Sequence, residues 1–328
     1  MASLEPTTAQ ADPTDRADRA NAAAAAALVV MWSSGFIGAE LGTRTASADT
    51  LLVWRYILGA AILLVWAWSR GMRVTRGAVW REGVVGVLTH ALYLAGVVTS
   101  VAVGVPAGIA ALVAALQPLL VGALAGSVLG QHTTRLQWWG LGVGFAGVVL
   151  VVADDVRVGS VPWWGYLLPA GGMLAISAGT LMERRWRSPV SLLDAFTIHV
   201  VVTAVLFVAE TGVAGRLAPP ADPDFWWAVA WILVLSMFGG QGLYLFVLRR
   251  GGATRVSTLM YLTPPTTMLW AFLMFGQRPG WLSLVGVVVC AVAVRMVLAT
   301  RPQPMPAGQA LGCGCGGTGP ADRPAADQ

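Results

Sequence analysis

Residues 106–128 read PAGIAALVAALQPLLVGALAGSV, a stretch that contains no charged side chain. About 20 mostly apolar residues in an α-helix cross the hydrocarbon core of a bilayer, which is about 30 Å thick. Nine further stretches of similar character are separated by short polar breaks. The ten expected spans are residues 22–42, 50–68, 80–100, 106–128, 137–153, 163–182, 191–210, 225–248, 255–275 and 281–299.

The composition of the chain agrees with a lipid environment. Of the 328 residues, 56% are hydrophobic and only 11% are charged, and the mean hydropathy is +0.69. A soluble protein of this length could not cover its surface with so few charges. The apolar runs are also continuous, whereas the strands of a membrane β-barrel alternate between apolar and polar residues. The sequence therefore predicts an all-α integral membrane protein.

The basic residues, all of them arginines, indicate the orientation of the chain. With the N-terminus in the cytoplasm, the cytoplasmic turns and tails hold Arg16, Arg19, Arg70, Arg73, Arg76, Arg81, Arg135, Arg184, Arg185, Arg187, Arg249, Arg250, Arg255, Arg301 and Arg323. The opposite side holds only Arg44, Arg157, Arg216 and Arg278. Cytoplasmic loops of membrane proteins are enriched in basic residues, so we expect both termini in the cytoplasm and the chain in the inner membrane. The net charge of +5 is then a topology signal, and no nucleic-acid partner is expected.

The two tails carry no apolar span. Residues 1–21 are polar and lack the pattern of a cleavable signal peptide, and residues 300–328 are rich in Gly and Pro. Both are expected to be disordered and cytoplasmic. Cys313 and Cys315 lie in the second tail, but two thiols without a histidine or another cysteine make an incomplete metal site. We therefore predict no metal and no cofactor.

The chain repeats itself. A shift of 146 positions lays Pro118 over Pro264 and Gly130 over Gly276, and a shift of 151 lays 92–94 over 243–245. The predicted repeats are residues 22–153 and 163–299, with five spans each. Because five crossings are an odd number, the second repeat enters the membrane from the opposite side. Inverted repeats are typical of secondary transporters, in which a site between the repeats opens alternately to each side. The competing interpretation is a duplicated membrane scaffold without transport.

The same stretches also resemble the EamA family of the drug/metabolite transporter superfamily. The likeness covers nearly the whole chain outside the tails, and its motifs are WSSGFIG at 32–38, WRY at 54–56, ALYL at 91–94, PAG at 106–108 with LQPL at 116–119, RRGGA at 249–253 and YLTPP at 261–265. The resemblance implies ten helices, inverted repeats and the movement of amino acids or other metabolites, commonly as export. The chain departs from the family pattern at Glu40, where a Lys is usual, and at Gln131 and Gln277, where a Glu is usual. Substrate and coupling therefore do not follow from the resemblance.

Polar side chains at membrane depth are energetically costly and usually face a bundle interior, so they are candidates for the substrate site. His90 and Tyr93 lie one helical turn apart in the third span, and Gln241 and Tyr244 take the same positions in the eighth. We predict that these four residues face one another across a central site. Hydrogen bonding between helices is the alternative.

Further candidates lie near prolines and near the outer face. The substrate candidates are Ser33, Ser34, Gln117, Tyr261 and Thr263, and the structural or gating candidates are Arg55, Glu40, Pro118 and Pro264. A proline removes a backbone donor and leaves a carbonyl free for a substrate or for water, although it can equally be a packing kink. For Arg55 we favour snorkelling or pairing with Glu40 over anion binding. His199 has no counterpart in the first repeat, and we expect it to be a contact between helices.

These features favour a transporter that exports small organic metabolites over other membrane proteins. A membrane-embedded enzyme needs clustered metal ligands or a nucleophile beside a base, and no such motif includes His90, His132 or His199. A channel would need a filter-like loop, and the sequence contains none. The expected partners are a small-molecule substrate and the lipid bilayer, and a homodimer is left open.

Overall fold

The computed structural model describes residues 13–130, 134–158 and 161–298. Within these ranges the chain forms helices and turns and no strand, so the all-α prediction is confirmed. Eight of the described helical stretches are long and apolar enough to cross a membrane: Ala20–Thr43, Ala48–Ser69, Arg76–Ala102, Ala107–Leu129, Arg135–Arg157, Trp163–Trp186, Leu192–Val213 and Pro223–Arg250. The protein is therefore a multi-pass membrane protein.

The first half contains the helices α1 (Pro13–Thr43), α2 (Ala48–Ser69), α3 (Arg76–Gly86), the π-helix η1 (Val87–Leu92), α4 (Tyr93–Ala102), α5 (Ala107–Ala114), α6 (Gln117–Leu129) and α7 (Arg135–Val158). The start of α1 at Pro13 lies before residue 22, so residues 13–21 are helical where we expected a disordered tail. The remainder of that tail lies outside the described residues, as do Cys313, Cys315 and the whole of residues 300–328.

The second half contains η2 (Trp163–Tyr166), α8 (Leu167–Trp186), α9 (Leu192–Val213), α10 (Pro223–Trp231), the π-helix η3 (Ile232–Gly240), α11 (Gln241–Met260), α12 (Thr263–Phe275) and α13 (Trp281–Leu298). We expected a turn at residues 249–254, between the eighth and ninth spans. Instead α11 continues through those residues, and the break follows at Tyr261 and Leu262. Glycine inside a helix costs only about 1 kcal/mol relative to alanine, so the paired glycines there lower the helix propensity without ending the helix.

Corresponding helices of the two halves begin and end at matching positions. Both ends of α12 lie 146 positions after those of α6, and each helix has a proline in its first turn, where the missing N–H costs nothing. Each also ends at a left-handed glycine, Gly130 with φ 68° and Gly276 with φ 67°. The third and eighth spans both contain a π-helical segment, η1 or η3. The repeat seen in the sequence is thus a repeat of local structure.

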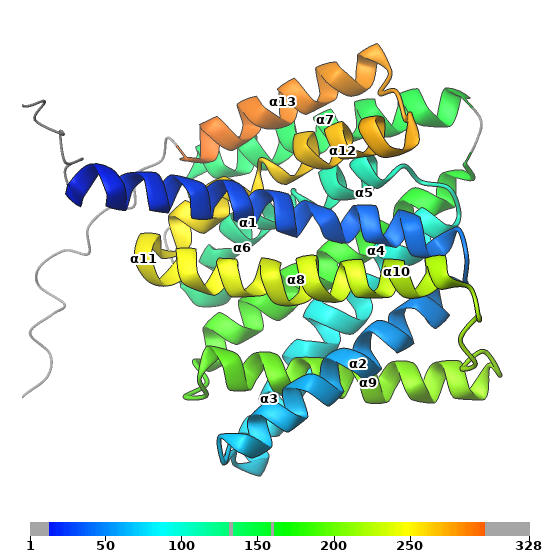
Figure 1. Cartoon of the computed structure of the whole chain (residues 1–328). Coiled ribbons are helices and arrows are strands. Elements are labelled where there is room, and N and C mark those ends of the chain that lie inside the picture. The colour runs from blue at the N-terminus through cyan, green and yellow to red at the C-terminus, as the bar shows by residue number, and fades with distance from the viewer. Residues whose placement is uncertain (1–12, 131–133, 159–160, 299–328) are drawn as a thin grey trace, which may run out of the picture.

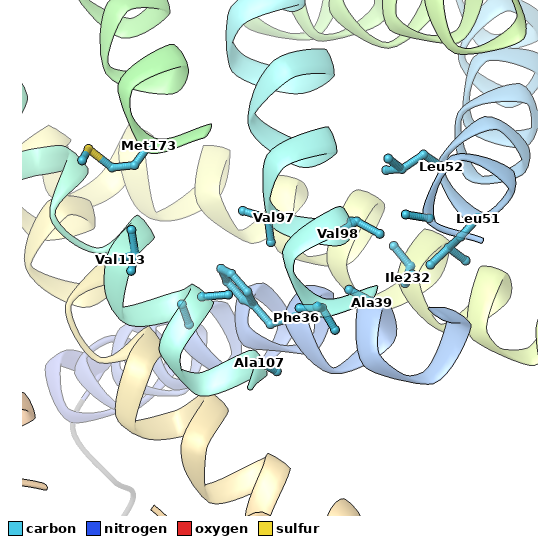
Figure 2. Close-up of a cluster of buried hydrophobic side chains, with 14 of the residues drawn as sticks. Phe36, Ala39, Leu51, Leu52, Val97, Val98, Ala107, Val113, Met173 and Ile232 are labelled. Carbon is cyan, nitrogen blue, oxygen red and sulfur yellow. The ribbon is translucent and has the colours of Figure 1, made fainter. Parts of the chain in front are cut away.

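The apolar core lies between helices that are far apart in the sequence. Figure 2 shows Phe36 of α1, Leu51 of α2, Val97 of α4, Val113 of α5 and Ile232 of η3 in one region, and all five are buried. In Figure 1, α1 runs across the middle of the bundle, with α7, α12 and α13 on one side of it and α2, α3 and α9 on the other. Polar groups on the inner faces of these helices are consequently shielded from lipid.

The contact between α7 and α13 depends on small residues. The Cys290 thiol of α13 donates to the backbone carbonyl of Gly144 in α7 over 3.5 Å. A Cβ atom added to Gly147 would lie 2.8 Å from the Cys290 sulfur and 2.9 Å from the Gly286 carbonyl oxygen. Small side chains allow membrane helices to approach this closely, because lipid provides no hydrophobic drive for their association.

Candidate functional site

His90 hydrogen-bonds to a tyrosine that the sequence analysis did not single out. Its Nδ1 atom lies 3.0 Å from the hydroxyl oxygen of Tyr56 in α2, and Tyr56 is fully buried. The His90 ring also contacts Phe196 of α9, with 5.8 Å between ring centroids. His90 belongs to η1, and π-helical turns in proteins frequently occur at functional sites. The structure therefore places His90 among aromatic and polar side chains in the bundle interior.

A buried histidine–carboxylate hydrogen bond lies beside His90. The Nε2 atom of His199 in α9 is 2.9 Å from a carboxylate oxygen of Glu82 in α3, and the Glu82 side chain is only 3% exposed. The rings of His90 and His199 are 5.5 Å apart. His199 does join two helices, as expected, but its partner is an acidic residue that we had not considered. Only the presence of a carboxylate inside the third span could have drawn attention to Glu82.

Arg55 lies in the same region, in α2, and is 7% exposed. Its guanidinium carbon is 5.5 Å from the centre of the Tyr56 ring. The Nε atom of Arg55 is buried without a hydrogen-bond partner. Of the two structural roles that we favoured for Arg55, pairing with Glu40 does not occur: the Glu40 carboxylate accepts a hydrogen bond from Arg44 at 3.1 Å instead. Arg44 is one helical turn further along α1, so its side chain reaches Glu40 locally.

The other half of the predicted central site has different neighbours. Tyr244 of α11 stacks at a tilt on Trp32 of α1, with 5.6 Å between ring centroids. Within the described part of the chain, no hydrogen bond or ring contact joins His90 or Tyr93 to Gln241 or Tyr244. A common site lined by these four residues remains a prediction.

The secondary candidates near α12 are brought together. The Ser33 hydroxyl donates to the backbone carbonyl of Thr263 at 3.3 Å, although α1 and α12 are far apart in the sequence. The Thr263 hydroxyl itself is buried without a partner. Pro264, which follows it, is buried in the first turn of α12. Tyr261 packs against the main apolar core.

The remaining candidates make separate contacts. The Ser34 hydroxyl donates to the Met31 carbonyl at 2.6 Å and so bonds within α1. The side-chain amide of Gln117, just before Pro118 in α6, donates to the Thr180 hydroxyl of α8 at 3.1 Å. In the described ranges, no three His, Cys, Asp or Glu residues are grouped in a way that would hold a metal ion. A ligand in the interior of this helix bundle would therefore contact hydrogen-bonding and aromatic side chains.

The membrane helices, their duplication and the buried polar interior agree with one known family. The profile of the EamA-like transporter family matches residues 21–153 and again residues 163–299. The chain belongs to the EamA-like transporter family. The resemblance inferred from the motifs is thereby confirmed, and the protein is a membrane transporter by family.

Relatives of this EamA-like chain are also named as transporters. An uncharacterized transporter of Archaeoglobus fulgidus is 22% identical over 279 residues, which are 83% of this chain and 94% of the relative. The uncharacterized inner membrane transporter YedA of Escherichia coli K12 is 23% identical over 274 residues, 82% of this chain and 88% of YedA. A WAT1-related chloroplastic protein of Arabidopsis thaliana is 30% identical over 176 residues, 48% of this chain and 40% of that protein.

A solved structure shares the fold. One solved structure, described as a crystal structure of a protein, aligns with this chain with a TM-score of 0.57 and 18% sequence identity. The alignment covers 85% of this chain and 96% of the chain in that structure. At this level of identity the likeness concerns the fold alone.

Proposed function

We propose that this protein is a secondary transporter that exports small organic metabolites across the cytoplasmic membrane by alternating access. The observation that carries the proposal is the buried polar group of Arg55, Tyr56, His90, His199 and Glu82 inside a bundle of membrane helices. Polar and ionisable residues at membrane depth are costly and usually mark solute or ion pathways. A family whose members are named as transporters supports the same function.

Ten crossings in two inverted repeats are part of the proposal. The shorter helices α12 and α13 would be the ninth and tenth spans. Both ends of α12 lie 146 positions after those of α6, and α13 begins 146 positions after α7. Figure 1 shows the start of α1 and the end of α13 on the same side of the bundle, which supports an even number of crossings. Rocking of one repeat against the other would then open the interior alternately to each side.

The proposed substrate site combines the candidates of both halves. His90 and Tyr93 contribute from the third span, Gln241 and Tyr244 from the eighth, and the further lining is Ser33, Ser34, Gln117, Tyr261 and Thr263. Arg55, Glu40, Pro118 and Pro264 would shape or gate it. Aromatic rings can stack on an organic solute while the few polar groups orient it.

Flux measurements test the function directly. Metabolites that accumulate in the medium of cells carrying the gene, but not of cells lacking it, identify solutes to load into proteoliposomes with purified protein. Saturable flux of such a solute is expected. If neither the medium nor the vesicles differ from protein-free controls, a duplicated membrane scaffold becomes the better account.

Substitutions at Tyr93 and Gln241 test the site. If both contact solute, Tyr93→Phe and Gln241→Ala should each weaken apparent affinity several-fold, because each removes a hydrogen bond worth about 0.5–1.5 kcal/mol. The melting temperature should stay near wild type. Ile62→Val in α2, at a side chain 49% exposed, is a control that should change neither quantity. Reduced stability with unchanged affinity would show that these groups only join helices.

The proposed topology predicts the side on which fused reporters are found. Because arginines are concentrated on one side, reporters after Arg187 and at the C-terminus should be cytoplasmic, and a reporter after Gly215 should be external. A cytoplasmic signal after Gly215 would exclude the inverted arrangement.

A further inference from the structure

Arg55 is a buried charge without a counter-ion. Three carboxylates of the same bundle already have partners: Glu40 pairs with Arg44 at 3.1 Å, Asp49 with Arg216 at 2.9 Å, and Glu82 with His199 at 2.9 Å. Among the described residues, no hydrogen bond or ion pair reaches the Arg55 guanidinium, and its Nε atom is buried and unsatisfied. The ring centre of Tyr56 lies 5.5 Å from the guanidinium carbon, and the phenol is neutral near pH 7. Its positive charge is therefore not neutralised by the protein.

Such an arrangement is unfavourable unless something else supplies the missing negative charge. An arginine does not lose its proton in proteins, so it cannot avoid the cost of burial by becoming neutral. Buried charges are normally paired. The ring of Tyr56 beneath the guanidinium offers a cation–π contact, which stabilises the cation but does not neutralise it. The ligand that completes this site must carry negative charge.

We infer that Arg55 binds the carboxylate of the transported solute. This inference rests on the proposed function, since it names the chemical class of the solute. One guanidinium matches one carboxylate in a planar, two-pronged pair. A phosphate group carries about two negative charges, and one guanidinium compensates only one of them. An amino acid would likewise bring an ammonium group for which the paired carboxylates leave no partner. The solute is thus a small organic monoanion.

The surroundings of Arg55 suit such a solute. Tyr56 provides aromatic surface beside the charge, and the Tyr56–His90 hydrogen bond fixes the position of its phenol. The organic part of the solute would pack on this ring while its carboxylate meets the guanidinium. The sequence analysis favoured a structural role for Arg55, by snorkelling or by pairing with Glu40, over anion binding.

The first part of the test needs no ligand. If the charge is uncompensated in the empty protein, Arg55→Met should raise the melting temperature of the protein in nanodiscs by about 2 °C or more. Arg44→Met removes a charge that is paired and half-exposed, and it should leave the melting temperature within about 2 °C of wild type. A fall in the melting temperature of Arg55→Met would overturn the inference, because the charge would then be satisfied within the fold.

The second part uses matched pairs of probes: short aliphatic and aromatic carboxylates with their amides. Wild-type protein should bind at least one acid on the order of 10- to 100-fold more tightly than its amide, as measured by thermal shift. This preference should vanish in Arg55→Met, remain in part in Arg55→Lys and remain in full in Arg44→Met. Equal binding of acids and amides, or no binding of any acid, would refute the carboxylate site.

The outcomes separate this inference from the proposed function. Saturable flux of solutes without a negative charge, with the same rate in Arg55→Met, would keep the transporter and remove the carboxylate site. Acid-selective binding that depends on Arg55 without flux in proteoliposomes would keep the site and remove transport.

Discussion

His199→Leu is expected to lower the free energy of unfolding by about 3–5 kcal/mol, because it leaves a carboxylate buried without a partner. Glu82 is only 3% exposed and His199 lies 2.9 Å from it, so water cannot take the place of the imidazole without a local opening. The pair joins α3 to α9, so its loss should also loosen these helices. The melting temperature in detergent and in nanodiscs is the measurement.

A second variant shows whether the unpaired charge is the cause. When Glu82→Leu is added to His199→Leu, an apolar pair replaces the hydrogen-bonded pair of His199 and Glu82, and most of the lost stability should return. Val205→Leu, in the same helix at an exposed position, is the matched control and should melt like the wild type. A double variant that is as unstable as His199→Leu would show that packing, and not the buried charge, determines the effect.

Gly147→Leu should prevent the close approach of α7 and α13. Even a Cβ atom at this position would lie 2.9 Å from the Gly286 carbonyl oxygen, which is backbone and cannot rotate away. Overpacking costs about 1–3 kcal/mol in well-packed cores, and the added isobutyl group should exceed that range here. We expect little monodisperse protein in size-exclusion chromatography and a clearly lowered melting temperature.

The same helix provides the control for this substitution. A Cβ atom at Gly142 in α7 would meet nothing within 4 Å, so Gly142→Leu adds the same side chain in open space. It should express and melt like the wild type, since leucine is also a better helix former than glycine. If both variants were equally damaging, helix propensity or insertion would explain the loss and the α7–α13 contact would not.

The membrane class and the repeat could be predicted from the sequence because lipid restricts the local choices of the chain. A span such as 106–128 must satisfy its backbone hydrogen bonds internally, so its length and composition already predict a helix. The positions of Pro118 and Pro264, and of Gly130 and Gly276, likewise act locally, at the start and end of α6 and α12. Where local signals were weaker, the helix boundaries in the structure differ from the predicted ones: α11 continues through its glycines, and α1 begins before the predicted first span.

Only the tertiary structure decided which polar groups meet. Glu82 and His199 are 117 residues apart, and Tyr56 and His90 are 34 apart, so no spacing in the sequence connects them. In water, an apolar stripe would show which face of a helix turns inward. In a bilayer, faces toward lipid and toward protein are both apolar, and small residues and interhelical contacts set the rotation of each helix. The sequence could therefore place His90 and Arg55 inside the membrane, but only the packing of α2, α3, η1 and α9 showed that His90 has partners and that Arg55 has no counter-ion.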